Sequence, residues 1–301
     1  MLLKVNPVRY LKKVEQRGGF LKLFNLETIG VEASAEEFVK RVDRTWDTTH
    51  DDIYHMKRKQ VIYLMDKYPE AKADIEKFYL KYAQNEAALS EMDAKLEKLN
   101  DDEMDVFQSI GVSKKRSLSI LGFNKLNNKE WTVDHLKNAP TYAQQTDDYR
   151  NMPRDYPTVD DDLFQYLYDV KFFEGCLSVI LDNRPNVTRI QTSLIQNLDF
   201  CEPDNHERYL APEGVHQDGV EVVIPAIIVR KTNVVGANSQ LYLEDDLVNP
   251  IWERSLENGE GTIMTDTGSP YYHAISCIQP QEKTKRAERG YLGFDLQLFY
   301  D

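Results

Sequence analysis

The hydrophobic pattern of the chain changes near residue 185, and this change constrains the fold more than any other feature. Before it, apolar residues recur at the three- and four-residue steps of amphipathic helices. After it, short apolar or alternating runs are separated by Gly, Pro, Asn and Asp, as strands are. Most of these runs follow one another without a helix-length segment between them, which favours antiparallel pairing. The sequence therefore predicts an α+β fold, an antiparallel sandwich or barrel backed by helices from the first half.

Helices are expected at several places before the change. Ser34 with Glu37 matches a capping box, which predicts a helix from there through about Trp46. Pro69 suits a first helical position, and the apolar spacing after it predicts a long amphipathic helix to about Leu99.

Further along, the Asn-Asp-Asp cluster at 100–102 ends this helix and can cap a short successor. Residues 111–157 lose periodicity and are expected to be irregular, whereas the aspartates at 160–162 can cap another helix that ends before Pro185. Six strands are expected after it, at 187–198, 220–231, 239–243, 261–266, 271–278 and 291–299. The expected division is a mainly helical region, 1–159, and a helix with a strand-rich core, 160–301.

The composition excludes several classes of function. The 301 residues include 37 basic and 50 acidic side chains, and the net charge of −13 would repel phosphate backbones, so nucleic acid is not an expected partner. No run reaches the about 18 apolar residues of a membrane span, and Met1–Tyr10 lacks the apolar core of a signal peptide, so we expect a cytoplasmic protein. Three widely spaced cysteines without a CxxC pair indicate reduced, mostly buried thiols.

One short segment carries the strongest sign of chemistry. His216 and Asp218 precede a predicted strand, and on extended backbone residues two apart point the same way. An imidazole and a carboxylate can therefore meet at one metal. His273, on a later predicted strand, could complete the two-His, one-carboxylate face that leaves three positions of Fe(II) open. The alternative is a turn in which Asp218 bonds local backbone and His216 packs or faces solvent.

The chain has a second His-x-Asp pattern, which shows that this spacing alone does not identify a metal-binding pair. His50 and Asp52 lie in a segment of helical character, where residues two apart diverge by roughly 200° around the axis. We therefore assign these two side chains to a solvated helix surface.

Several ordered segments resemble the isoleucine 4-hydroxylase-like family of 2-oxoglutarate/Fe(II) dioxygenases. The run P-E-G-V-H-Q-D-G-V at 212–220 looks like the metal-binding segment of that family. Further similarity extends over a strand, Gly-rich turn and strand at 230–242, over Asp266 with the distal-histidine strand at 271–278, and over a closing strand at 289–294. The resemblance covers about residues 187–299, with weaker similarity at 46–59.

This resemblance implies a double-stranded β-helix (a jelly roll, cupin-like) with the helical N-terminal half packed on it. It implies that Fe(II) is bound by His216, Asp218 and His273, with no catalytic residue beyond these ligands, and that 2-oxoglutarate and O2 are consumed. Ascorbate would serve as reductant in vitro. The implied reaction is hydroxylation of an unactivated C–H bond of a small substrate, such as a free amino acid or a derivative, with release of succinate and CO2. The intact Asp218 argues against halogenation, while desaturation and cyclisation stay open.

Two arginines could bind the distal carboxylate of 2-oxoglutarate, which a guanidinium holds best through paired charged hydrogen bonds. Both Arg286 and Arg289 lie a little over ten residues after His273. Arg289 is preferred because it shares strand parity with Tyr291 and Asp295. At this point the sequence differs from the family pattern, because the family tends to place this arginine just after a glycine, whereas Arg289 precedes Gly290. Ser239 is a further candidate for cosubstrate contact, with a turn and strand start as its alternative role.

Four further residues are candidates for substrate contact. Ser193 and Gln196 lie on an unusually polar strand, Tyr272 adjoins His273, and Arg230 could pair with a carboxylate. Packing, a sheet edge and a strand-end charge are their alternative roles. The substrate itself cannot be read from any motif.

Three other functions stay open. One is a different metal-dependent enzyme on a cupin-like barrel, another is a non-catalytic interaction protein, and the third is a 2-oxoglutarate oxygenase acting on a protein or a carrier-bound substrate. Residues 60–155 could form a lid, a homodimer interface or a substrate-selecting insertion.

Overall fold

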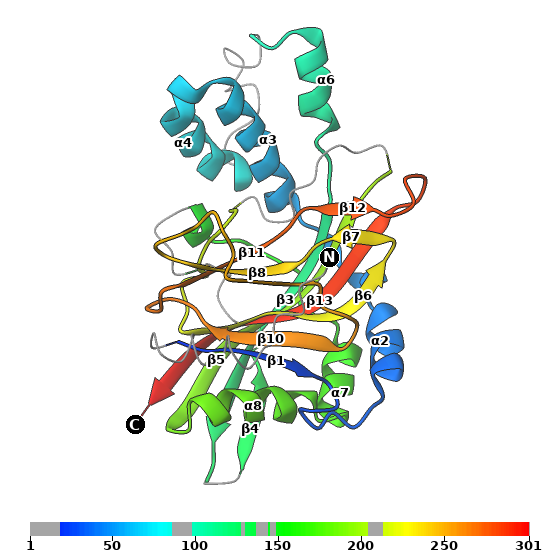
Figure 1. The fold of residues 1–301 in the computed structure, drawn as a ribbon, viewed down its shortest axis with the longest axis vertical. Helices are drawn as coiled ribbons and strands as arrows, with labels where there is room; N and C mark the ends of the chain where they lie inside the picture. The colour runs from blue at the N-terminus through cyan, green and yellow to red at the C-terminus, as the bar shows by residue number, and fades with distance from the viewer. Residues whose placement is uncertain are drawn as a thin grey trace.

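The computed structural model of the protein describes residues 19–85, 98–127, 130–136, 144, 149–203 and 213–300. A strand-rich body carries a cap of helices at one end, and three more helices lie against the body away from the cap (Figure 1). The expected α+β class is confirmed. Within the described residues, no helix is both long enough and apolar enough to cross a membrane.

One large antiparallel sheet forms the centre of the body. Five of the six expected strand runs correspond to single strands and the run 271–278 to two, although several ends differ by a few residues. The strand order is β1 (Leu21–Asn25), β10 (Glu260–Thr265), β6 (Val222–Thr232), β13 (Ala287–Tyr300), β5 (Val187–Cys201), β3 (Lys114–Lys125) and β2 (His50–Asp51), with β4 (Trp131–His135) beside β3.

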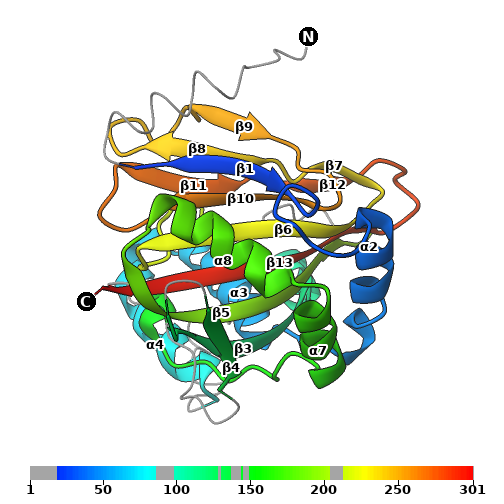
Figure 2. The same ribbon diagram turned by 90° about the horizontal axis from the view of Figure 1, so that it is seen from below.

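Smaller sheets pack over part of this one. Figure 2 shows β8, β9 and β11 grouped on the side of the molecule away from α7 and α8. The order is β11 (Tyr271–Ile275), β8 (Ser239–Leu243) and β9 (Trp252–Arg254), and a separate pair joins β12 (Ile278–Pro280) to β7 (Val234–Gly236). The expected strand at 271–278 is therefore two strands that belong to different sheets.

Helices α7 (Asp161–Asp169) and α8 (Phe172–Asn183) cover the opposite side of the large sheet. Phe172 packs on Phe294 of β13, with ring centroids 6.0 Å apart. The side chain of Asp160 caps α7 as expected, by accepting the backbone N–H of Asp162 at 2.8 Å. A single helix was expected here, but Lys171 takes a left-handed conformation with φ of 58° and divides it.

Helix α2 (Ala35–Asp43) lies beside the large sheet and begins where the capping box predicted. Ser34 accepts a hydrogen bond from the backbone N–H of Glu37 at 3.2 Å. Phe38 and Val42 on its inner face are fully buried in the main core.

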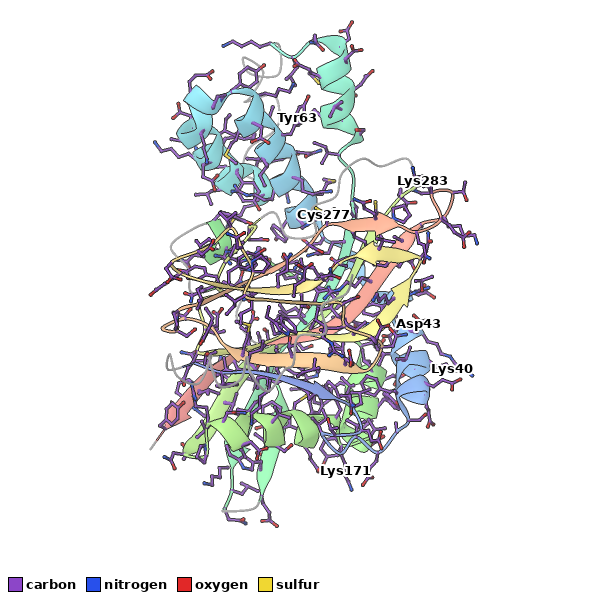
Figure 3. All side chains as sticks on the ribbon, in the orientation of Figure 1. Lys40, Asp43, Tyr63, Lys171, Cys277 and Lys283 are labelled. Carbon is purple, nitrogen blue, oxygen red and sulfur yellow. The ribbon has the colours of Figure 1, made fainter. Side chains whose placement is uncertain are left out.

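The cap consists of α3 (Ile53–Lys67), α4 (Lys72–Ala83) and α6 (Asp101–Ser109), with Tyr63 on its α3 surface (Figure 3). It has a hydrophobic cluster of its own, which includes Leu64, Ile75 and Phe107. Asn100 and Glu103 form a full capping box, as the polar cluster predicted. The long helix expected to Leu99 ends at Ala83 instead, and the part of its expected span at 86–97 lies outside the described residues, as does the segment 1–18.

The prediction that residues 111–157 are irregular is wrong, because they contain β3 and β4. β3 pairs with β5 from Lys114 to Asn124 and so belongs to the central sheet. Its hydrophobic alternation is hidden because Lys114, Arg116 and Ser117 are polar although they are buried or half-buried. The central sheet thus includes strands from both sides of residue 159.

Candidate metal centre

His216, Asp218 and His273 converge on one point. One donor atom of each lies within 4.8 Å of the other two, and this is the one such cluster of metal-binding side chains among the described residues. His216 Nε2 is 3.4 Å from Asp218 Oδ1, and His273 Nε2 is 3.1 Å from Asp218 Oδ2. Ligands at adjacent corners of an octahedron with bonds of about 2.1 Å lie roughly 3 Å apart, so the three donors fit one face of a metal ion.

The backbone holds the two histidines in register. His216 and His273 form an antiparallel bridge, in which the N–H of each donates to the carbonyl of the other at 3.0 and 2.9 Å. His216 Nδ1 also lies 2.9 Å from the carbonyl oxygen of Gly214, which leaves Nε2 directed to Asp218. The loop before β6 and the strand β11 are therefore fixed to each other at the site itself.

Asp266, which follows β10 and is fully buried, supports the site from behind. Its Oδ2 accepts backbone N–H groups of Asp218, Gly219 and Val220 at 2.8, 3.0 and 3.4 Å. Its Oδ1 faces His273 Nδ1 at 3.6 Å. A carboxylate behind a ligating imidazole is a common outer partner in metal sites, because it orients the ring.

The electrostatics of the site favour a cation. Burial opposes the ionisation of Asp218, but the charge of His273 and hydrogen bonds from both histidines outweigh it and hold the pKa of this carboxyl well below its usual range. Burial also lowers the pKa of His273, yet Asp218 and Asp266 outweigh that effect and raise it to about 10. The two carboxylates thus stabilise positive charge between the histidines, which a divalent metal provides as well as a proton.

A cavity opens in front of the three ligands, between the sheets and the cap. The chain carries a net charge of −13, but among the described residues that line this cavity basic side chains outnumber acidic ones. The acidic ones are Asp52, Glu213, Asp218 and Asp295, and the basic ones are Arg58, Lys114, Arg116, Arg150, Arg154 and Arg289. This reversal of charge suits anionic ligands.

Arg289 is one of these residues and lies in a charged row across the large sheet. Register places Asp199 of β5 between Lys114 of β3 and Arg289 of β13. Asp199 Oδ1 is 3.3 Å from Lys114 Nζ, and its Oδ2 is 3.4 Å from Arg289 Nη1. All three side chains are buried. This row places two buried cations and the carboxylate between them beside the cavity.

Of the other candidate residues from the sequence analysis, one lines the cavity and five do not. Ser239 lines the cavity, whereas Arg286, Ser193, Gln196, Tyr272 and Arg230 do not. Arg286 stacks on the ring of Phe200 at 3.8 Å.

The side chains of Gln196, Ser193 and Arg230 each have a hydrogen-bond or ion-pair partner elsewhere in the fold. Gln196 points to the other face of β5 and donates to Thr45 at 2.7 Å. Ser193 accepts the N–H of Asp295 at 3.3 Å. Arg230 pairs with Glu288 and with Asp43, which Figure 3 marks on α2.

The prediction that His50 and Asp52 lie on a solvated helix surface is correct for the exposure of His50 and wrong for Asp52. His50 is exposed, but it lies on the short strand β2. Asp52 is buried, caps α3 by accepting the N–H of His55 at 3.0 Å, and pairs with Arg116 at 3.3 Å. The assumption of helical backbone was wrong, although the two residues still do not form a metal site.

Several cavity residues were missed by the sequence analysis. They come from β3 and from the segment around 144–156, and they include Lys114, Gln144, Tyr149, Arg150 and Arg154. Gln144 donates to Asp218 Oδ1 at 2.7 Å, and Tyr149 donates to Glu213 at 2.5 Å. The clustering of Arg and Tyr in a segment without periodicity was the available signal.

The site presents the two-His, one-carboxylate donor set of a candidate metal centre. The chain belongs to the 2OG-Fe dioxygenase family, whose model matches residues 103–295. The family supplies the expectation of Fe(II), 2-oxoglutarate and O2, and the donor set of the site fits it. The narrower resemblance to isoleucine 4-hydroxylase-like enzymes remains a proposal. No curated protein sequence matches the chain significantly.

Solved structures share the fold at low sequence identity. IDO from Bacillus thuringiensis matches with a TM-score of 0.56 and 11% identity, over 99% of this chain and 98% of that one. A bsmA homolog from Methylobium petroleophilum PM1 matches with a TM-score of 0.57 and 11% identity, over 99% and 95%. Both matches extend over the cap as well as the sheets.

Proposed function

We propose that this 2OG-Fe dioxygenase hydroxylates an unactivated C–H bond of a small substrate, a free amino acid or a derivative of one. The observation that carries this proposal is the convergence of His216, Asp218 and His273 at the wall of a cavity whose described lining residues include more cations than anions. When bound there, Fe(II) with 2-oxoglutarate and O2 supplies the oxidising power, and succinate and CO2 are released.

The chain's own residues have separate tasks in this proposal. His216, Asp218 and His273 hold the metal on one face and leave its other positions toward the cavity. Asp266 orients Asp218 and His273 through the contacts described above. Arg289, with Lys114 beside it, binds the distal carboxylate of 2-oxoglutarate, because a buried guanidinium offers it two parallel charged hydrogen bonds.

The strand order supports a double-stranded β-helix as the framework for this site. In the large sheet, β5, β13, β6 and β10 are consecutive neighbours. In the small sheet, the His216 bridge, β11, β8 and β9 are consecutive neighbours. A four-stranded run in one sheet and a three-stranded sheet extended by the His216 bridge, in this order, support a jelly roll.

The cap supports a role in substrate selection. Arg58 of α3 and Tyr79 of α4 line the cavity together with residues of both sheets. Tyr149 packs against Tyr79 with centroids 5.4 Å apart and bonds Glu213, three residues before His216. The cap is thus connected to the metal-binding loop, which favours a small substrate enclosed beneath it.

A succinate-release screen tests the proposal. The purified protein is supplied with Fe(II), 2-oxoglutarate and ascorbate across a panel of free amino acids, and succinate formed without a substrate is subtracted. We expect one or a few amino acids to raise succinate release and to gain one oxygen atom, as measured by mass spectrometry. A panel that never raises it above the uncoupled rate contradicts the proposed substrate class.

A further inference from the structure

We propose that Gln144 is a positioning residue that sets the rotation of the Asp218 carboxylate at the metal centre. Gln144 precedes Asp218 by 74 residues in the sequence, yet the fold brings it to the metal-binding loop, residues 213–218. The inference rests on the metal-binding role that the proposed function gives to Asp218, and it does not depend on the identity of the substrate.

The carboxylate of Asp218 needs a partner of its own. Asp266 accepts the backbone N–H of Asp218 at 2.8 Å and so fixes the main chain at this residue. That contact does not set the rotation of the carboxylate about the Cβ–Cγ bond, because this torsion has only a broad, roughly two-fold preference. A hydrogen bond to one carboxylate oxygen can set it.

Gln144 supplies this hydrogen bond. Its Nε2 donates to Asp218 Oδ1 at 2.7 Å, in a partly buried contact. The other oxygen, Oδ2, lies 3.1 Å from His273 Nε2. The contact from Gln144 therefore holds the carboxylate in the rotation that keeps Oδ2 beside the second imidazole.

The orientation of the Gln144 amide is determined from both sides. Its Oε1 accepts a hydrogen bond from Arg154 Nη2 at 3.1 Å. A guanidinium has only donors and an ionised carboxylate has only acceptors, so the amide oxygen faces Arg154 and the amide nitrogen faces Asp218. Because the amide is neutral, it orients Asp218 without cancelling the negative charge that a metal ion requires.

The segment that carries Gln144 is hydrogen-bonded to the metal-binding loop at further points. Tyr149 donates to Glu213 at 2.5 Å. Arg150 Nη1 donates to the carbonyl oxygen of Gln217 at 2.8 Å. The backbone N–H of Gln144 donates to the carbonyl oxygen of Arg150 at 3.1 Å. These contacts hold Gln144 in place before a metal arrives, so that little entropy is lost when the ligand set is used.

Metal affinity, measured without turnover, tests the inference. Gln144→Met approximately keeps the size of the side chain and removes the N–H donor. In titrations of the full-length protein followed by electron paramagnetic resonance, we expect its Mn(II) affinity to be about 10- to 100-fold below that of the wild type, as is usual when an outer partner of a ligand is lost. Gln144→Asn keeps an amide on a shorter side chain and should retain part of the affinity.

Gln240→Met is the matched control. Gln240 lines the same cavity from β8, where its Oε1 accepts a hydrogen bond from the hydroxyl of Tyr242 at 3.0 Å. The same substitution at this position should leave the Mn(II) affinity at the wild-type value.

Co(II) substitution separates the orientation of a ligand from the stability of the fold. The visible d–d bands of Co(II) depend on the arrangement of its ligands. Gln144→Met should therefore shift these bands relative to the wild type, whereas Gln240→Met should not. Denaturant titration of the metal-free proteins should give similar midpoints for the two variants.

Several results would overturn the inference. These are wild-type Mn(II) affinity in Gln144→Met, an equal loss of affinity in Gln240→Met, or a loss in Gln144→Met with unchanged Co(II) bands. If Gln144→Met does not fold, Gln144→Asn provides the same comparison, and wild-type affinity and bands in that variant would overturn the inference. Failure of the wild-type protein to bind Mn(II) would contradict the metal centre and with it the proposed function, whereas wild-type binding that is insensitive to Gln144 contradicts only the role of this residue.

Discussion

The carboxylate of Asp266 accepts the backbone N–H of Asp218 at 2.8 Å while its other oxygen faces the ring of His273. One buried side chain therefore contacts two candidate metal ligands, one in the loop before β6 and one on β11. A carboxylate at His273 Nδ1 favours the tautomer that carries its proton there and leaves Nε2 free to bind a metal.

Asp266→Asn tests this role. If the remaining oxygen keeps the backbone hydrogen bonds, the amide N–H2 faces His273 Nδ1 and favours the tautomer in which Nε2 is protonated. We expect Mn(II) affinity, measured by titration with electron paramagnetic resonance, to fall about 10- to 100-fold. Asp266→Ala should in addition lower the free energy of unfolding, because it leaves buried backbone N–H groups without an acceptor. Wild-type Mn(II) affinity in Asp266→Asn would show that the contact does not control the ligand.

The two candidate arginines for the cosubstrate differ in position, and this gives a matched pair of variants. Arg289 lines the cavity, whereas Arg286 stacks on Phe200 outside it. Arg289→Gln should weaken 2-oxoglutarate binding by about 10- to 100-fold, the loss expected for charged hydrogen bonds, with Mn(II) affinity unchanged. Arg286→Gln should bind 2-oxoglutarate like the wild type. The reverse pattern in calorimetry would assign the cosubstrate to Arg286 and contradict the site as described.

Gly290, next to Arg289, explains how β13 passes the buried indole of Trp46. A Cβ added at Gly290 would meet a ring carbon of Trp46 at 2.5 Å and Arg230 Cβ at 3.1 Å. Gly290→Ala should lower the free energy of unfolding by about 1–3 kcal/mol through overpacking, as measured by denaturant titration. Gly122→Ala on β3 is the control, since its added Cβ meets nothing closer than 3.9 Å. Equal stability of both variants would show that the strand shifts to accommodate the methyl group.

The strands of the second half could be predicted because their β-branched runs and turn residues agree with the observed sheets. The alternation that placed Arg289 with Tyr291 and Asp295 is also observed, since all three line the cavity. The order of His216, Asp218 and His273 along the chain was informative because strand geometry brings them together.

Other features could not be predicted because they depend on partners distant in sequence. β3 was missed because Lys114 and Arg116 are charged, yet their acidic partners Asp199 and Asp52 allow them to lie in a central strand. The polarity of Gln196 suggested a ligand contact, but its hydrogen-bond partner is Thr45, 151 residues away.

Anaerobic Fe(II) binding, followed by the absorption change on adding 2-oxoglutarate, tests the central claim most directly. We expect the wild-type protein to bind one Fe(II) per chain and to give the visible band of a chelated 2-keto acid. His216→Ala, Asp218→Ala and His273→Ala should each lose at least about 100-fold in Fe(II) affinity and lose the band, while His50→Ala, at the second His-x-Asp pattern, keeps both. Equal Fe(II) binding by the wild type and the three ligand variants would contradict the account.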